Sequence, residues 1–161
     1  MIPACSQKKD PRSDENAATL VPKAEPTTMT IYFPKVDASG IAKTQMEVAD
    51  KAKTMNDTFD QLIVALSRPA DPTVLAIFPE KYALYGTFLD KDMLYLDFAA
   101  GIEKAVFPNI QLEQLALEAF LTTIKVNFPY VQQVKFLSEH EDTQIVFGHT
   151  YAQQPFSLKD L

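Results

Sequence analysis

Apolar residues recur at helical spacing in the middle of the chain. The positions i, i+3, i+4 and i+7 of this stretch are Phe59, Leu62, Ile63 and Leu66. Asn56, Asp57 or Thr58 is available before them as an N-cap, and a proline stands beyond them. Because a repeat of 3.6 residues places the four apolar side chains on one face, the pattern predicts an amphipathic helix.

A second and longer stretch repeats the same spacing. Its apolar and small residues are Leu112, Leu115, Ala116, Ala119, Phe120, Thr123 and Ile124. Asn109 precedes the repeat as a candidate N-cap, so the predicted helix runs from Ile110 to about Asn127. We expect this principal helix to pack on a sheet, which its small residues would allow to approach closely.

Strand patterns precede and separate these two helices. Met29–Phe33 is rich in β-branched and aromatic residues and is closed by a proline, which favours a first strand. Thr44–Val48 is a candidate for a second, short strand. Tyr82–Leu89 and Met93–Phe98 are apolar, aromatic runs separated by an Asp-Lys-Asp turn, which is the arrangement of a β-hairpin.

The second strand of this hairpin alternates between two kinds of side chain. One face carries Leu94, Leu96 and Phe98. The other face carries Met93, Tyr95 and Asp97. Since successive side chains of a strand point to opposite faces, the alternation predicts a half-buried strand on which Asp97 faces solvent. We therefore expect the sheet to be covered on one side only.

Two more strands are predicted after the long helix. They are Val131–Leu137 and Gln144–Phe147, joined by an acidic turn at Glu139–Asp142. The element order is then strand, candidate strand, helix, two strands, helix and two strands. This order predicts an α+β fold, a single α/β sandwich whose mostly antiparallel sheet is packed by two main helices. The 161 residues suit one domain of ordinary size with a tail.

The beginning of the chain differs in composition from the rest. Ser6–Thr28 mixes charged residues, Ala and Thr with three prolines, and it has too few large apolar residues to offset its ordering entropy. We predict a flexible linker over residues 1–27 and one folded domain over residues 28–161. Ala4-Cys5 resembles the end of a lipoprotein signal sequence, in which the cysteine becomes lipidated. Either Cys5 is this lipid anchor, or it is an incidental thiol.

Charge and composition exclude several classes of function. The chain has 15 Lys and Arg against 21 Asp and Glu, a net charge of -6, so we expect no nucleic-acid partner. One cysteine and two histidines cannot form a zinc cluster or an intramolecular disulfide. The four glycines lie far apart, never in the spacing of a phosphate-binding loop. We therefore expect no cofactor and no metal.

Several short segments stand in a joint order that is more specific than any one of them. Up to the long helix they are Ile31–Pro34, Ala65–Pro69, Ala76–Glu80, Leu94–Phe98 and Leu121-Thr122. After it they are Phe128–Val134, Gly148-His149 and Pro155-Phe156. Together, from about Thr30 to Leu158, they resemble the GerMN domain of sporulation and germination proteins and of assorted bacterial lipoproteins. The chain departs from the family in two loops, Gly101–Pro108 and Glu139–Thr143.

The resemblance implies a compact α/β module without a known catalytic constellation, often tethered outside the cytoplasmic membrane. It also implies a shape related to the ring-building modules of a sporulation secretion complex. By this analogy we expect an extracytoplasmic, membrane-anchored lipoprotein that is not an enzyme and that binds an envelope protein or its own copies. The alternative is a small-ligand or cell-wall-glycan binding domain, in which tyrosines and acidic loops line a groove.

Three aspartates could carry chemistry of another kind. Asp90, Asp92 and Asp97 lie close in sequence and could bind Ca²⁺ or Mg²⁺ or form an acid and base pair. An ordinary structural role is favoured for these aspartates, because short acidic side chains suit a hairpin turn and Asp97 is predicted to face solvent.

Histidines and tyrosines complete the candidates. His140 lies between two glutamates and is either a pH-sensitive patch or part of an ordinary exposed turn. His149 is the other candidate general base, and no G-x-S-x-G elbow supplies a nucleophile, so a hydrolase is unsupported. The candidate interface residues, which could equally be sheet packing, are Tyr82, Tyr85, Tyr95, Tyr130 and Tyr151.

Overall fold

The first unit of the fold is an antiparallel hairpin. The computed structural model describes residues 27–48, 54–78, 83–99, 101–104 and 107–161. Within them, β1 (Thr27–Pro34) pairs with β2 (Ile41–Val48), and Ile31 lies opposite Thr44. The predicted first strand is confirmed, and the candidate second strand exists but begins at Ile41 instead of Thr44. The predictions for residues 1–26, which include Cys5 and the linker, and for Tyr82 concern positions outside the described residues.

The first helix, α1 (Met55–Ser67), confirms the predicted apolar row, but its cap differs from the prediction. The cap is Thr54, whose side-chain oxygen accepts a hydrogen bond from the backbone N–H of Asp57. The Asp57 carboxylate in turn accepts one from the backbone N–H of Thr54. This reciprocal capping box satisfies two backbone donors at once, which explains why the helix is capped two residues before Asn56, the earliest of the predicted caps.

The second sheet is built on the predicted hairpin of β3 (Leu84–Asp90) and β4 (Met93–Phe98). The helix α2 (Ile110–Asn127), capped by Asn109 as predicted, leads from β4 to the parallel strand β5 (Gln133–Ser138). Parallel neighbours require a crossover of this length, and a helix is its usual form. The sheet is therefore mixed, with one parallel pair in an otherwise antiparallel arrangement.

Several short elements were not foreseen from the sequence. They are η1 (Ile102–Lys104), β6 (Glu141–Asp142), β8 (Thr150–Tyr151) and β9 (Phe156–Ser157). Both β6 and β9 pair with β5, and β8 pairs with β7 (Ile145–Val146). Two-residue strands give no periodic signal, because alternation needs at least four positions. The α+β class is confirmed.

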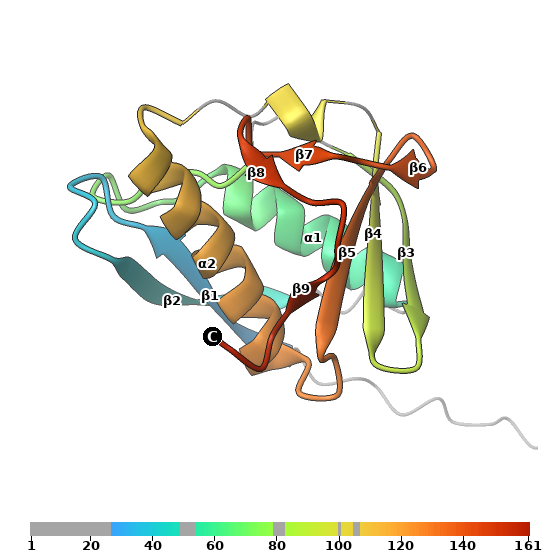
Figure 1. The fold of residues 1–161 in the computed structure, drawn as a ribbon. Coiled ribbons are helices and arrows are strands. Elements are labelled where there is room, and N and C mark those ends of the chain that lie inside the picture. The colour runs from blue at the N-terminus through green and yellow to red at the C-terminus, as the bar shows by residue number, and fades with distance from the viewer. Residues whose placement is uncertain (1–26, 49–53, 79–82, 100, 105–106) are drawn as a thin grey trace, which may run out of the picture.

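The two sheets enclose an aromatic core. In Figure 1 the β1–β2 hairpin and the β3–β4–β5 sheet stand on either side of α1, and α2 packs against β1. The fully buried phenylalanines among the described residues are Phe59, Phe78, Phe98, Phe120, Phe136 and Phe147. Phe78 lies at their centre, with its ring centroid 5.0 Å from that of Phe120 and 5.5 Å from that of Phe98. Burial of each ring stabilises the fold by roughly 1.5–3 kcal/mol.

Side chains of α2 close the outer edge of β1. The backbone N–H of Thr30 donates to Asn127 Oδ1 at 3.0 Å, and that of Tyr32 donates to Thr123 Oγ1 at 3.0 Å. Asn127 also donates from Nδ2 to the Thr30 carbonyl oxygen. A helix thus replaces a neighbouring strand at this edge and satisfies its backbone groups. Neither helix of the described part of the chain combines the length and apolar character that a membrane-spanning helix needs.

Candidate functional site

The edge strand β3 carries exposed apolar side chains. In the strand order β3–β4–β5, β3 is the outermost strand, and no other described strand pairs with its free edge. Tyr85, Phe88 and Leu89 on this strand are 55%, 57% and 40% exposed. Proteins usually protect such edges with charges, prolines or short strands, so an apolar edge indicates a surface that another chain covers.

An aromatic surface extends from this edge across the outer side of the sheet. On β4 the predicted inner residues Leu94, Leu96 and Phe98 are fully buried, which leaves Tyr95 on the opposite side, paired with Phe88 of β3. The Phe88 ring lies over Gly86, where an added Cβ would come within 2.9 Å of it. We call Tyr85, Phe88 and Tyr95 the aromatic face.

Asp97 does not face solvent, and this prediction was wrong. It is 2% exposed and accepts a hydrogen bond from the backbone N–H of His140 at 3.0 Å. Its second carboxylate oxygen lies 2.5 Å from Nδ1 of the same histidine. The alternation rule placed Asp97 on the outer side correctly, but the loop with His140 covers that end of the strand. The His140 ring lies against the Tyr85 ring at a centroid distance of 4.7 Å and an interplanar angle of 31°. We call the pair of Asp97 and His140 the Asp97 clamp, and it contacts the aromatic face through Tyr85.

A second buried carboxylate, Glu113 of α2, binds the other histidine. It accepts hydrogen bonds from the His149 backbone N–H at 3.0 Å and from the Thr150 hydroxyl at 2.7 Å, and the His149 ring nitrogen Nδ1 lies 2.9 Å away. Burial alone would raise the pKa of Glu113, but the bonds from Thr150 and His149 outweigh it and hold the pKa below its ordinary value. The carboxylate is therefore ionised at neutral pH.

A buried lysine closes the β5 side of the outer surface. The Nζ atom of Lys135, which is 6% exposed, donates to the carbonyl oxygen of Gln153 at 2.5 Å and lies 3.4 Å from the Asp142 carboxylate. The C-terminal segment thus covers β5, whereas β3 and the neighbouring part of β4 stay open. The prediction of a sheet covered on one side holds for the β3 half only.

The predicted tyrosines do not form one surface. Tyr85 and Tyr95 lie on neighbouring strands, as described. Tyr130, half exposed, follows α2 and packs edge-on against Phe128, and Tyr151 is exposed on β8. The sequence did not single out Phe88, although its position opposite Tyr95 in the predicted hairpin was the signal that could have identified it.

The geometry offers no support for acid–base or metal chemistry at the candidate aspartates. Asp90 ends β3 and Asp92 lies in the turn, at the other end of β4 from Asp97. At about 3.3 Å per residue, Asp92 and Asp97 are roughly 17 Å apart along the strand. No group of three metal-binding side chains occurs among the described residues. His149 binds Glu113 of α2 and directly precedes β8, which lies at the opposite end of the molecule from the β3–β4 turn in Figure 1.

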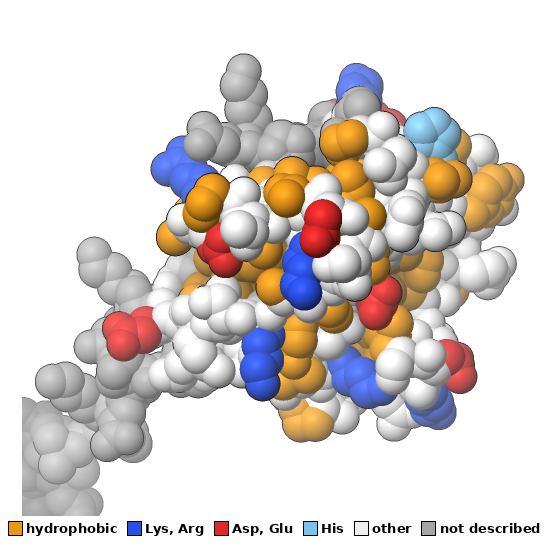
Figure 2. All heavy atoms as spheres, turned by 90° about the vertical axis from the view of Figure 1, so that its left-hand side faces the viewer, with side chains coloured by type: hydrophobic (Ala, Val, Ile, Leu, Met, Phe, Trp, Pro, Cys, Tyr) orange, Lys and Arg blue, Asp and Glu red, His pale blue; other side chains and the backbone are white. Residues whose placement is uncertain are grey.

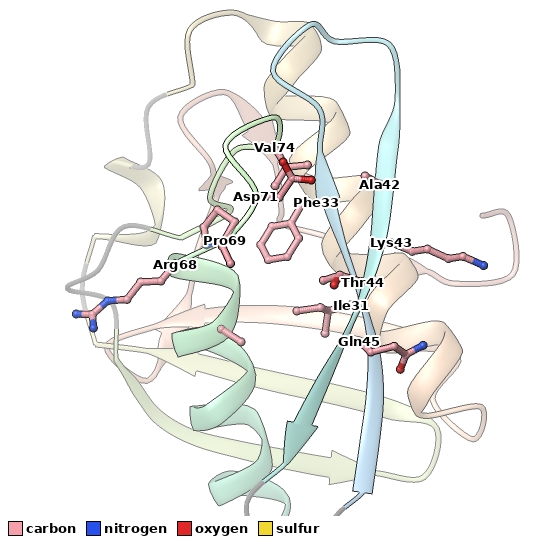
Figure 3. Close-up of a pocket in the computed structure, with 12 residues that line it drawn as sticks. Ile31, Phe33, Ala42, Lys43, Thr44, Gln45, Arg68, Pro69, Asp71 and Val74 are labelled. Atoms are coloured by element: carbon pink, nitrogen blue, oxygen red, sulfur yellow. The ribbon is translucent and has the colours of Figure 1, made fainter.

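A hollow of about 310 Å³ lies between the β1–β2 hairpin and the end of α1 (Figure 3). Phe33 and Val74 form apolar parts of its lining, with Asp71 beside them. The side chains of Lys43 and Arg68 point away from it. A small-ligand site usually has polar groups that converge on one point, and the charged side chains at this hollow do not.

Comparisons with known proteins identify the family and the fold. A family model described as "Germane: Sporulation and spore germination" matches residues 30–144. None of the curated proteins compared with the chain matches it.

Three solved structures, from two bacteria, are similar to this fold. A protein described as a lipoprotein from Clostridium perfringens has 17% identity and a TM-score of 0.55, over 84% of this chain and 89% of that one. The first GerMN domain of the sporulation protein GerM from Bacillus subtilis has 16% identity and a TM-score of 0.59, over 82% and 99%. For the tandem GerMN domains of the same protein the values are 15% and 0.61, over 83% and 48%. At these identities the similarity shows the fold alone.

Proposed function

Because the chain belongs to the Germane family of sporulation and spore germination, we propose that it is a non-catalytic envelope module that binds protein. The binding surface is the aromatic face together with the free edge of β3. The partner is an envelope protein of a sporulation- or germination-type assembly, or a second copy of this chain.

One observation carries this proposal, the exposure of apolar residues on an unpaired strand edge. A partner strand that adds to β3 would satisfy the free backbone groups of that edge, while Phe88 and Tyr85 would bury apolar area against it. Tyr and Phe are enriched at protein interfaces, because their rings supply contact area at low entropic cost. The bonds to Asp97 orient His140, and its contact with Tyr85 would restrict that ring before a partner arrives and so lower the entropic cost of binding.

The proposed location is outside the cytoplasmic membrane, with Cys5 as a lipid anchor. Supporting this are the Ala4-Cys5 pair and the similarity in fold to a protein described as a lipoprotein. A lipid at Cys5 would hold the domain near the bilayer, where an envelope partner would meet it. Incorporation of labelled fatty acid that is lost on Cys5→Ser would support the anchor, and incorporation that survives this substitution would exclude it.

Sedimentation velocity of the full chain over a wide concentration range, with and without detergent-solubilised envelope extract, tests the binding surface. We expect a larger species that disappears in Phe88→Lys, because a charge on an edge strand opposes pairing. Val126→Lys is the matched control, since Val126 is similarly exposed (49%) but lies on α2. A strict monomer that extract does not change, or a larger species that persists in Phe88→Lys, would contradict the proposal and favour the ligand-binding alternative.

A further inference from the structure

A second strand edge, that of β2, borders a groove on a different part of the surface from the aromatic face. β1 and β2 form a sheet of two strands, and α2 side chains close the edge of β1. No described strand pairs with the outer edge of β2. About half the residues of an edge strand direct their N–H and C=O groups outward, so β2 presents several free backbone donors and acceptors.

The groove runs between β2 and α1 and consists of two adjoining hollows. One is the hollow of about 310 Å³ beside Phe33, and the other, of about 400 Å³, is more open and lies beside Val64. Ala65 of α1 lines both, so the two hollows adjoin at this residue. Figure 3 shows the first hollow between α1 and the hairpin.

The groove is lined by charged and polar residues together with apolar and small ones, and the latter come from the facing sides of β2 and α1. Ala42, Thr44 and Met46 of β2 lie opposite buried residues of β1 in the strand register, so their side chains face α1. On the helix, Val64 is 59% exposed. An extended segment paired with β2 would place every second side chain in the groove, against Val64 and Ala65.

Carboxylates flank the groove at both of its ends. Asp60 of α1 lines the open hollow, and Asp71 lines the other. Glu47 borders the open hollow too, but it is two residues from Gln45 on β2, so its side chain points to the other face of the strand. Bonds from the Thr73 hydroxyl and backbone N–H lower the pKa of Asp71, so it is ionised at neutral pH. Burial, and then the Asp57 carboxylate, raise the pKa of Asp60, a shift that a nearby cation would reverse.

Basic side chains near the groove are directed elsewhere. Lys43 and Arg68 border the first hollow, but in Figure 3 both extend away from it. On the wider surface around the hairpin, apolar side chains reach solvent between acidic and basic ones (Figure 2). The charge that faces an occupant of the groove is therefore negative, and the complementary occupant carries positive charge at its ends.

We propose that this groove binds an extended peptide segment of a partner protein by strand addition to β2. The segment has small apolar side chains at alternate positions and a basic residue at each end. This mode combines main-chain hydrogen bonds, which give affinity, with pockets for alternate side chains, which give specificity. It does not depend on the aromatic face, and the two surfaces can be tested separately.

The probe is a seven-residue peptide, Lys-Val-Thr-Val-Thr-Val-Lys, labelled with a fluorophore and titrated with the full chain in an anisotropy assay. We expect saturable binding, and amide shifts in the ¹⁵N spectrum of the protein that concentrate in β2 and α1. Replacement of both peptide lysines by glutamate should weaken binding at least fivefold, because the ends of the peptide would then carry the same negative charge as the carboxylates beside the groove.

Variants of the protein distinguish binding in the groove from nonspecific electrostatic attraction between the peptide and the protein surface. Thr44→Lys places a long cationic side chain over the groove and should weaken binding more than tenfold. Gln45→Lys adds the same charge to the next residue of β2, whose side chain points to the other face, and should weaken binding less than threefold. Asp60→Asn should weaken binding about two- to fivefold, as expected for a partly exposed ion pair.

Three results would overturn the proposal: no saturable binding at millimolar peptide, equal effects of Thr44→Lys and Gln45→Lys, or amide shifts confined to β3. The third result would assign the peptide to the aromatic face, which would support the proposed function while excluding the groove. A circular dichroism spectrum of each variant that matches the parent ensures that weaker binding is not loss of fold.

Discussion

Two buried carboxylates of this molecule each hold a loop through hydrogen bonds from a single histidine. One carboxylate lies on a strand and the other on a helix. Asp97 of β4 and Glu113 of α2 each accept a hydrogen bond from the backbone N–H of a histidine and contact the ring of the same residue. Both carboxyl side chains are 3% exposed, whereas the rings of His140 and His149 are 71% and 77% exposed. The charge is buried, and its partner remains at the surface.

The comparison shows what a single histidine can supply to a buried charge. Its backbone and its ring give two donors from one residue, which offsets the cost of removing a carboxylate from water. The loops also contain non-glycine residues with positive φ, Glu139 and His140 at one clamp and Phe147 at the other. Such conformations cost roughly 1 kcal/mol each, so the carboxylates stabilise turns that the backbone alone disfavours.

The Asp97 and Glu113 clamps differ in the number of hydrogen-bond donors that each carboxylate has and in the aromatic contact that each histidine ring makes. Glu113 accepts a third hydrogen bond, from Thr150, whereas Asp97 has no third donor among the described hydrogen bonds. The Tyr85 ring packs at a tilt against His140 of the Asp97 clamp, and no aromatic contact to His149 is found among the described residues. The Glu113 clamp thus has more hydrogen bonds, and the Asp97 clamp is the one that contacts the proposed binding surface.

Removal of each carboxylate gives the largest expected effect. Glu113→Ala should lower the free energy of unfolding by about 3 kcal/mol and Asp97→Ala by about 2 kcal/mol, because three donors lose their acceptor in one case and two in the other. Urea denaturation measures both values. Glu118→Ala, at an exposed position of the same helix, should change stability by less than about 0.5 kcal/mol. Equal losses in the two clamps would show that the Thr150 bond contributes nothing.

Acid should release the Glu113 clamp. The folded-state pKa of Glu113 lies below its ordinary value of 4.5, so its stabilisation is fully present above pH 4.5 and is lost as the pH falls through the folded-state pKa. Glu113→Gln cannot titrate, and we expect its stability deficit at pH 7 to shrink as the pH falls below 4.5. Urea midpoints from pH 7 to pH 3 measure this difference. A deficit that stays constant with pH would exclude an ionised Glu113 as the source of the stabilisation.

Long periodic elements could be predicted from the sequence, whereas short and contact-dependent ones could not. The helix over Ile110–Asn127 and the hairpin over Leu84–Phe98 each repeat a pattern many times, so the prediction survives local exceptions. The strand predicted at Gln144–Phe147 exists as β7, but the two-residue strands β6, β8 and β9 exist because β5 and β7 offer pairing partners, which is tertiary information. The Thr54 cap was missed because its neighbours were equally good capping residues.

The clamps illustrate the same limit at the level of sites. Glu113 belongs to a helical row with Ala116, Phe120 and Ile124, and a carboxylate in an otherwise apolar row was a signal available in the sequence. Asp97 gave no such signal, because its strand face is covered only by a loop 43 residues later in the chain. The prediction that Asp97 faces solvent failed on this distant contact, not on the strand pattern.

Replacement of each histidine by alanine should give the smallest change in stability of these variants. The two replacements should differ in their effect on assembly through the aromatic face. The backbone N–H bond survives in His140→Ala and His149→Ala, so each should lower the free energy of unfolding by less than about 1 kcal/mol, as for partly exposed polar contacts. Only His140 supports Tyr85, so only His140→Ala should weaken assembly through the aromatic face, by about three- to tenfold for the lost ring contact. Sedimentation velocity of the two variants under identical conditions measures this. Equal weakening by both would mean that the Asp97 clamp does not position the aromatic face, and that its two hydrogen bonds serve the loop alone.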